Sequence, residues 1–326
     1  MDFDALGIVV IGRNEGQRLV DCLVSLESHK GRIVYVDSGS SDGSVSSAEG
    51  LGVFVVRLDM SQPFTAARAR NEGFAAIMAM RPQTEFVQFV DGDCELDRDW
   101  LDAALAFMAN RKDVAVVCGR RRERYPKQSV YNQLCDIEWN TPVGEASACG
   151  GDSLLRAIAF KQIGGFQPQL IAGEEPELCA RLRQKGWTIW RLDAEMTRHD
   201  AAITHFSQWW ARARRSGYGY AEVSALHPRS GIWGKEKARA IIWGGLLPLL
   251  IGVSAPFVPS MLWVVLIYPI QICQIALRRG PADIGNWIFA LFITLAKFAE
   301  LQGILNFYWG RLRGKKAELI EYKGND

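Results

Sequence analysis

The sequence predicts an α/β protein, with a mostly parallel sheet covered by helices on both faces and a helical membrane module behind it. In the first half of the 326 residues, short apolar runs alternate with helical patterns, which is typical of a parallel sheet. From Ala240 to Leu277, 38 positions carry no charge, nearly the length of two membrane crossings. The composition changes near Trp233, so we expect a soluble domain over residues 1–232 and membrane-associated helices over 233–326.

The apolar runs of the first half give the expected strands: Leu6–Ile11, Arg32–Asp37, Val53–Arg57, Phe86–Val90 and Val114–Cys118. After the first strand we expect a helix that carries Leu19, Leu23 and Leu26. Further helices are expected over Phe64–Met80, where Pro63 suits the first turn, and over Trp100–Asn110. Open sheets of this kind bind ligands beyond the carboxyl ends of their strands. Asp37 and Asp91 both lie at such ends, so we expect the functional site there.

The uncharged run is expected to form a hairpin over about residues 240–277, although a buried globular helix pair is the alternative. Basic residues flank it on both sides, and the positive-inside tendency places them in the cytoplasm. The next apolar stretch, Ile284 to Ala296, has 13 residues before Lys297, which favours an interfacial or re-entrant helix over about 284–309. A crossing there would also carry Arg311, Arg313, Lys315 and Lys316 outward.

The composition excludes several classes of protein. A formal charge of +2 gives no reason to expect a nucleic-acid partner. Seven cysteines without a CxxC pair, and only four histidines, argue against a zinc cluster or a disulfide framework. The N-terminal apolar run is too short for a signal peptide. We therefore expect reduced thiols and a cytoplasmic domain.

The segment "TEFVQFVDGD" ends an apolar strand in two carboxylates, Asp91 and Asp93. Two such carboxylates repel each other unless a cation or hydrogen-bond donors compensate them. Mg²⁺ or Mn²⁺ would do so, since these ions prefer carboxylate oxygens and keep positions for phosphate. A plain turn is the alternative. An EF-hand is excluded, because Leu96 stands at the sixth loop position and Asp102 at the twelfth.

The segment "VDSGSSDGS" also ends a strand in a carboxylate, Asp37, which is followed by a Gly/Ser-rich turn. Asp37 could accept a hydrogen bond from a nucleobase, with the small residues allowing close backbone approach. Equally, the segment could be a solvated turn before a helix capped by Ser41 or Asp42. The residues alone leave both interpretations open.

Taken together, several segments resemble family 2 glycosyltransferases in order and spacing: "VVIGRNEGQRLVDCLVSL", "VDSGSSDGS", "ARARNEGF", "FVDGDCELDRDWL", "CGGDSLLRAIAFKQIGGF" and "GEEPELCARLRQKGW". The resemblance extends from about Gly7 to Tyr220. It implies a GT-A-like catalytic domain over residues 1–232, followed by a membrane hairpin. Similar enzymes act in bacterial exopolysaccharide and surface-glycan pathways.

The resemblance implies roles for individual residues. The nucleotide-sugar would be bound by Asn14, Glu15, Asp37, Arg70, Asp91, Gly150 and Gly151. Asp93 would ligate the metal directly, and Asp91 would approach the ribose or the metal. His199, in "MTRHDAAITHF", would reach the metal or the diphosphate, although a lone histidine is often structural.

Glu174 and Glu175 occupy the place where the family usually has Glu-Asp, before a helix signalled by Pro176. Acids there could simply complement the helix dipole. Alternatively, Glu175 is the general base at the acceptor hydroxyl, with a pKa raised by the bound diphosphate. Whether Glu174 shares this role stays open.

The resulting hypothesis is an inverting, metal-dependent transfer of one sugar. It runs from a nucleoside-diphosphate sugar to a lipid-linked or glycan acceptor at the cytoplasmic face of the inner membrane. Single transfer is favoured because "QWWAR" (208–212) lacks the tryptophan that follows the arginine in polymerising relatives. The alternatives are a nucleotidyltransferase, which would release pyrophosphate, and a catalytically silent membrane scaffold.

Overall fold

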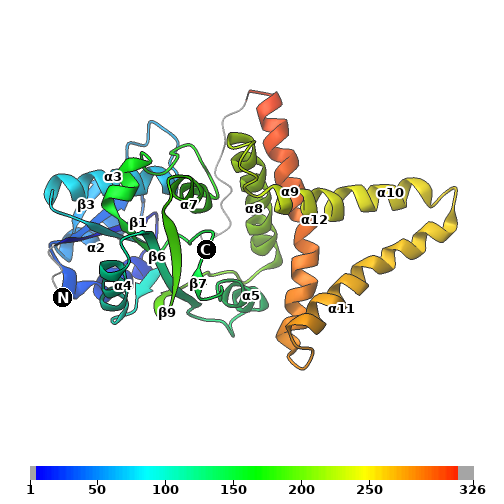
Figure 1. The fold of residues 1–326 in the computed structure, drawn as a ribbon, viewed down its shortest axis with the longest axis horizontal. Helices are drawn as coiled ribbons and strands as arrows, with labels where there is room; N and C mark the ends of the chain where they lie inside the picture. Colours follow the sequence, from blue (N-terminus) through cyan, green and yellow to red (C-terminus); the bar gives the residue numbers. More distant parts are fainter. Residues whose placement is uncertain (1–4, 315–326) are drawn as a thin grey trace. The chain divides into compact units, whose positions relative to one another are not determined.

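The computed structural model describes residues 5–314, and within them one sheet organises the first part of the chain (Figure 1). Its strands follow the spatial order β3-β2-β1-β4-β8-β6-β9-β5, with β7 paired to β9. The strands are β1 (Leu6–Gly12), β2 (Ile33–Asp37), β3 (Phe54–Arg57), β4 (Phe86–Asp91), β5 (Cys94–Leu96), β6 (Val114–Glu123), β7 (Gly144–Glu145), β8 (Ser153–Arg156) and β9 (Thr188–His199).

Four of the five predicted strands form the parallel half of this sheet, and the fifth, Val114–Cys118, is part of β6 in the mixed half. β3, β2, β1 and β4 pair in parallel, and the register sets Gly12 opposite Asp37 and Ile11 opposite Asp91. The carboxyl ends of β1, β2 and β4 therefore meet at one edge, as expected. Beyond β4 the sheet is mixed, because β8 runs antiparallel to both β4 and β6 and β5 runs antiparallel to β9.

Helices cover both faces of the sheet, because alternate residues of each strand point to opposite sides. On one face, Ile8 and Val10 pack with α1 (Gln17–Ser25), α2 (Ser44–Gly50) and α4 (Trp100–Asn110). On the other, Val9 and Ile11 pack with α3 (Ala66–Met80), α6 (Ala157–Gln162) and α7 (Glu174–Gln184). This double cover explains why β1 and β2 read as continuous apolar runs.

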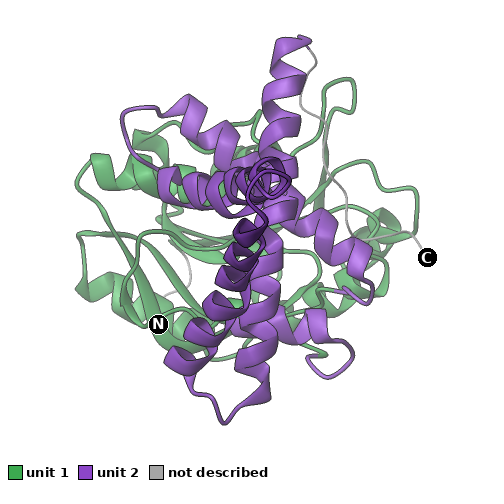
Figure 2. Cartoon of the chain, turned by 90° about the vertical axis from the view of Figure 1, so that its right-hand side faces the viewer, with its two compact units in different colours: residues 1–125, 138–201 green, residues 126–137, 202–326 purple. Residues whose placement is uncertain are grey.

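The described residues divide into two compact units, coloured in Figure 2. Unit 1 comprises residues 5–125 and 138–201 and contains the sheet. Unit 2 comprises residues 126–137 and 202–314, so it includes most of α5 (Val130–Glu138) and all of α8 (Phe206–Leu226). Compactness therefore sets a boundary near residue 202, about thirty residues before the change in composition at Trp233.

Unit 2 contains three helical stretches that are long and apolar enough to cross a membrane. The first runs over 234–254, through α9 (Gly234–Ile241), a π-helical turn (Ile242–Leu246) and α10 (Leu247–Ser254). The second runs over 259–279 and ends in α11 (Ile267–Arg279). The third is α12 (Ile284–Leu312).

The third stretch, α12, is longer than the apolar run from Ile284 to Ala296. The helix predicted over about 284–309 is α12, which has 29 residues and continues past the 13-residue apolar stretch through Lys297, whose ammonium pairs with Glu300 at 2.6 Å. The length of α12 is therefore sufficient for a membrane crossing. The interfacial placement stays a prediction, and Lys315 and Lys316 lie outside the described residues.

Close packing between α8 and α12 depends on glycine. A Cβ on Gly303 would lie 1.9 Å from the carbonyl oxygen of Arg214, inside any possible contact distance. We expect Gly303→Ala to lower the free energy of unfolding of the detergent-solubilised chain by roughly 1–3 kcal/mol, as overpacking does. Gly310→Ala is the control, because nothing lies within 4 Å of its Cβ position. Equal melting temperatures for the two variants would contradict the expected close contact.

Candidate active site

Two loops at the carboxyl edge of the sheet are tied together by side chains from the predicted nucleoside pocket. Asp37, which ends β2, accepts hydrogen bonds from the backbone of Gly39 and Ser40, each at 3.0 Å. Asn14, which follows β1, accepts one from the Ser41 backbone at 2.8 Å and adopts the left-handed φ of 54°. Asp37 and Asn14 therefore hold neighbouring loops in one arrangement, as a shared binding edge requires.

Glu15 lies in the same β1 loop as Asn14, and its carboxylate pairs with Arg18 at 2.9 Å. The backbone of the next residue, Gly16, donates to the hydroxyl of Ser44 at 3.1 Å and so joins this loop to α2. The three residues predicted for the nucleoside pocket are thus neighbours beyond the ends of β1 and β2. Their contact with a nucleoside stays a prediction.

Arg70, on α3, is the centre of a buried ionic cluster. Its guanidinium pairs with Asp91 at 2.8 Å, with Glu174 at 3.1 Å and with Glu175 at 3.0 Å. Only 2% of its side chain is exposed, and its guanidinium lies 5.5 Å from the ring centre of Phe166. Burial alone lowers the pKa of Arg70, but the three carboxylates outweigh it and raise that pKa above its ordinary value. One arginine thus brings together acids that are far apart in the sequence.

Asp91 lies between two guanidinium groups. Its Oδ1 faces Arg70, and its Oδ2 accepts a hydrogen bond from Arg121 of β6 at 3.0 Å. Burial raises the pKa of Asp91, but both guanidiniums act against it and the net result is a lowered pKa. Asp91 therefore stays ionised in this setting. Its predicted contact with ribose or metal is untested, since both oxygens here face arginine.

A fully buried carboxylate, Asp152, contacts both Asp91 and Arg121. It accepts hydrogen bonds from the Asp91 backbone at 2.9 Å and from the Thr197 hydroxyl at 2.8 Å, and it pairs with Arg121 at 3.3 Å. Burial raises its pKa. Asp152 thus fixes both the end of β4 and the orientation of Arg121.

The predicted "GG" segment, Gly150 and Gly151, lies against the cluster. A Cβ on Gly151 would lie 2.4 Å from Arg70 Nη2 and 2.8 Å from Asp91 Oδ2. A side chain at position 151 would therefore displace the Arg70–Asp91 ion pair, independently of any sugar. Gly150 is less constrained, with its Cβ position 3.8 Å from Arg121.

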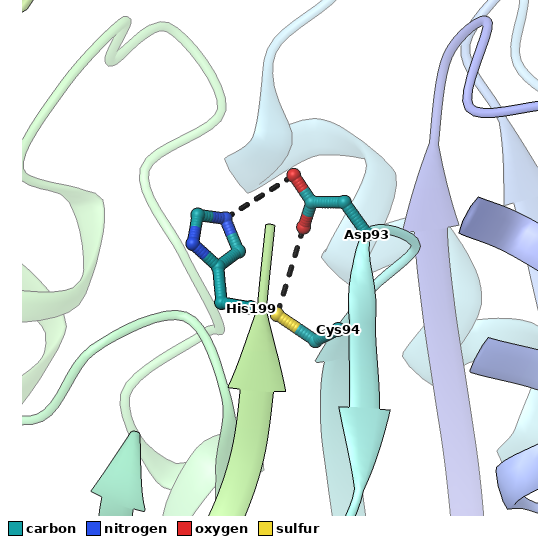
Figure 3. Close-up of side chains that lie close together, drawn as sticks. All are labelled: Asp93, Cys94 and His199. Carbon is teal, nitrogen blue, oxygen red and sulfur yellow. Dashed lines mark hydrogen bonds and ion pairs between the residues drawn. The ribbon is translucent and has the colours of Figure 1, made fainter. Parts of the chain in front are cut away.

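Asp93 and His199 form the candidate metal site (Figure 3). Asp93 directly precedes β5 and His199 ends β9, and the antiparallel register brings them together. His199 Nε2 lies 3.2 Å from Asp93 Oδ2, and both side chains are 8% exposed. Cys94 donates to Asp93 Oδ1 at 3.5 Å, and burial raises the pKa of its thiol well above the usual value. A carboxylate oxygen and an imidazole nitrogen fit a divalent cation, whereas a neutral thiol fits it poorly.

Glu175 is a buried carboxylate with a raised pKa. It lies in the first turn of α7, which begins after Gly173. Burial and the neighbouring charge of Glu174 raise the pKa of Glu175 to about 7, against the opposing effect of Arg70. A carboxylate with a pKa near the working pH can both accept and release a proton efficiently.

Carboxylates outnumber guanidinium groups among the ion pairs of this cluster. Arg70 and Arg121 pair with four carboxylates, those of Asp91, Asp152, Glu174 and Glu175, and a fifth carboxylate, Asp93, lies against His199. A buried excess of negative charge is unfavourable unless protons or a cation compensate it. The raised pKa of Glu175 supplies part of this compensation, and a divalent ion at Asp93 and His199 would supply more.

Sequence reasoning missed two residues of this site, Arg121 and Asp152. Asp152 directly follows the "GG" pair, so its place in that motif was a usable signal. Arg121 belongs to the run "GRRRER", a pattern typical of a solvent-exposed strand or helix face, so the sequence gave no signal that Arg121 is part of the site. The basic residues Arg212, Arg214 and Arg215 lie on α8 in unit 2, outside the unit that contains the cluster.

This sheet, with the acidic site at its carboxyl edge, has the arrangement that the resemblance to GT-A-type glycosyltransferases predicts. Residues 7–149 match the family described as glycosyl transferase family 2. This match agrees with the glycosyltransferase motifs found in the sequence.

Comparison with known proteins agrees with this assignment. The chain is 26% identical over 253 residues to the pre-mycofactocin glycosyltransferase of Mycobacterium tuberculosis, covering 74% of this chain and 50% of that protein. It is 22% identical over 187 residues to the O-antigen chain rhamnosyltransferase WbaN of Salmonella anatum, covering 53% and 58% respectively. The chain thus spans about half the length of the curated relatives it matches.

Among solved structures, the mannosyltransferase PcManGT from Pyrobaculum calidifontis, in complex with GDP-Man and Mn²⁺, has a similar fold. The TM-score is 0.63 at 14% identity, covering 94% of this chain and 88% of that one. The fold likeness therefore extends beyond the 7–149 segment that defines the family.

Proposed function

We propose that this protein transfers one sugar from a nucleoside-diphosphate sugar to an acceptor hydroxyl, with inversion at the anomeric carbon. The observation that carries the proposal is Glu175, a carboxylate with a pKa of about 7 held by Arg70 beside Asp91. All three lie at the edge of the sheet where ligands of such folds bind. The relatives named as glycosyltransferases support the same reaction class.

In the proposed reaction, ionised Glu175 accepts the proton of the acceptor hydroxyl. The hydroxyl oxygen forms a bond to the anomeric carbon, while the bond from that carbon to the diphosphate oxygen breaks and its electron pair leaves with the diphosphate. Attack from the opposite face gives inversion. A divalent cation, Mn²⁺ or Mg²⁺, held by Asp93 and His199 would neutralise the charge on the departing diphosphate. Arg70 keeps Glu175 and Glu174 in place throughout.

The donor is proposed to lie along the loops after β1 and β2. Asn14, Glu15 and Asp37 would bind the nucleoside, and Asp91 and Arg70 would lie near the ribose and the diphosphate. Gly150 and Gly151 would let the backbone approach the donor sugar. The complex of PcManGT with GDP-Man and Mn²⁺ supports a nucleotide sugar and a metal as joint ligands of this fold.

The acceptor is proposed to be lipid-linked or part of a glycan, at the cytoplasmic face of the inner membrane. The apolar stretches over 234–254 and 259–279 support membrane association, since a soluble acceptor would need no such anchor. The basic residues that flank the hairpin support a cytoplasmic catalytic domain. The name of the O-antigen chain rhamnosyltransferase agrees with a surface-glycan role.

Calorimetry with UDP, GDP and CMP, with and without Mn²⁺, tests this function. We expect one nucleotide to bind, and its affinity to fall at least about tenfold without Mn²⁺ or in Asp93→Asn, because losing even a group that only supports a metal ligand has effects of about 10–100-fold. Failure of every nucleotide to bind would favour a silent scaffold. Release of pyrophosphate from a nucleoside triphosphate would favour a nucleotidyltransferase.

A further inference from the structure

The aromatic ring of Trp139 contacts two residues of the ionic site, His199 and Arg121. Trp139 directly follows α5 and is half-buried. Its ring centre lies 4.7 Å from that of His199, in an edge-to-face arrangement with an interplanar angle of 76°. The guanidinium carbon of Arg121 lies 5.1 Å from the centre of the Trp139 ring. One indole therefore touches an imidazole and a guanidinium that come from different strands.

Each of these two partners holds one carboxylate of the Asp91-Gly92-Asp93 segment. His199 Nε2 lies 3.2 Å from Asp93 Oδ2, and Arg121 lies 3.0 Å from Asp91 Oδ2. The ring contacts of Trp139 are with His199 and Arg121, so its influence on the two carboxylates passes through these residues. Its position makes it the common neighbour of both interactions.

The contact types determine what Trp139 can do. An edge-to-face pair restricts how the imidazole rotates, and a cation–π contact restricts the plane of the guanidinium. Groups that orient a metal-binding histidine affect metal affinity by about 10–100-fold even though they never touch the ion. The sequence offered no sign of this, because Trp139 belongs to none of the family motifs.

We propose that Trp139 is a positioning residue that holds His199 and Arg121 in the orientation required for divalent-cation binding. The proposal rests on the proposed function, because it takes Asp93 and His199 as the cation site. Trp139 itself binds neither cation nor substrate in this scheme. It sets how strongly the cation binds before any nucleotide arrives.

Mn²⁺ binding to the full-length, nucleotide-free protein, followed by electron paramagnetic resonance, tests the proposal. We expect Trp139→Ala to weaken Mn²⁺ binding about 10-fold or more, the size of effect seen when a supporting group is lost. Trp139→Phe keeps a ring edge and should bind Mn²⁺ within about threefold of the original protein, since most of the contact survives. Trp139→Leu fills the space without a ring and replaces the alanine variant should that fail to fold.

The matched control is Trp190, another half-buried tryptophan of unit 1 with the same kinds of contact. Its ring lies 4.8 Å from the guanidinium of Arg111 and 5.5 Å from Phe107. Trp190→Ala should therefore lose comparable packing while Mn²⁺ binding stays unchanged.

Unchanged Mn²⁺ affinity in Trp139→Ala would overturn the positioning role and leave the proposed function standing. An equal loss in Trp139→Ala and Trp190→Ala would also overturn it, since the effect would then be general destabilisation. Should the original protein transfer sugar without binding Mn²⁺, only the cation role of Trp139 would fall. Should it bind neither Mn²⁺ nor any nucleotide, the proposed function would fail as well.

Discussion

Glu175→Gln should reduce sugar transfer by about 10²–10⁴-fold while nucleotide binding stays unchanged, because general-base catalysis contributes about this much. Glutamine keeps the size of the side chain but cannot accept the hydroxyl proton. Arg70 retains its contacts with Asp91 and Glu174, so the donor side of the site should persist. Donor turnover with a membrane extract as acceptor, together with calorimetry, measures both quantities. Normal turnover in this variant would remove Glu175 from the role.

The pH dependence of the reaction provides an independent check on the same residue. A base must be ionised to accept a proton, and the pKa of Glu175 is about 7. The value of kcat/KM should therefore rise through about pH 7 and level off above it. Glu174→Gln is the control: it removes a neighbouring charge that raises the pKa of Glu175, so the rise should move to lower pH. Loss of transfer in Glu174→Gln alone would instead identify Glu174 as the base.

The fold was predictable where burial leaves a pattern in the sequence. β1, β2 and β4 are buried on both faces, so they read as continuous apolar runs and their ends were placed within one residue. β5, β7 and β8 have only two to four residues, too few for any periodicity to appear. These short strands run antiparallel to their neighbours, which is why the mixed half of the sheet was not foreseen.

The site was predictable where two like charges lie close together within one segment and repel each other. The like charges of Asp91 and Asp93 required compensation, and that alone indicated a site. What compensates them lies far away in the sequence: Arg121 is 30 residues from Asp91, and Glu174 is 104 residues from Arg70. Such pairings are set by tertiary packing, and a single sequence carries no local trace of them.

Arg70→Met should be the most destabilising substitution at this site. It removes the guanidinium that faces Asp91, Glu174 and Glu175 and leaves three largely buried carboxylates without it. Breaking one side of a buried ionic cluster lowers the free energy of unfolding by about 3–5 kcal/mol. The free energy of unfolding of Arg70→Lys should lie between those of the original protein and Arg70→Met, because an ammonium keeps the charge but cannot reproduce the forked hydrogen bonds of a guanidinium. Chemical denaturation of the detergent-solubilised protein measures the loss.

The pH dependence and a surface control separate this charge effect from simple loss of packing. Because the folded-state pKa of Glu175 is raised, its proton stabilises the fold at low pH, and that contribution disappears as pH rises through about 7. Without Arg70 the remaining carboxylates hold protons more readily, so the variant should be less destabilised at pH 5 than at pH 8. Arg57 pairs with Glu49 at an exposed site, and Arg57→Met should change stability by only about 0–1 kcal/mol at either pH. If Arg70→Met showed an equally small, pH-independent loss, the guanidinium could not be what holds these acids together, and the charge argument for the whole site would fail with it.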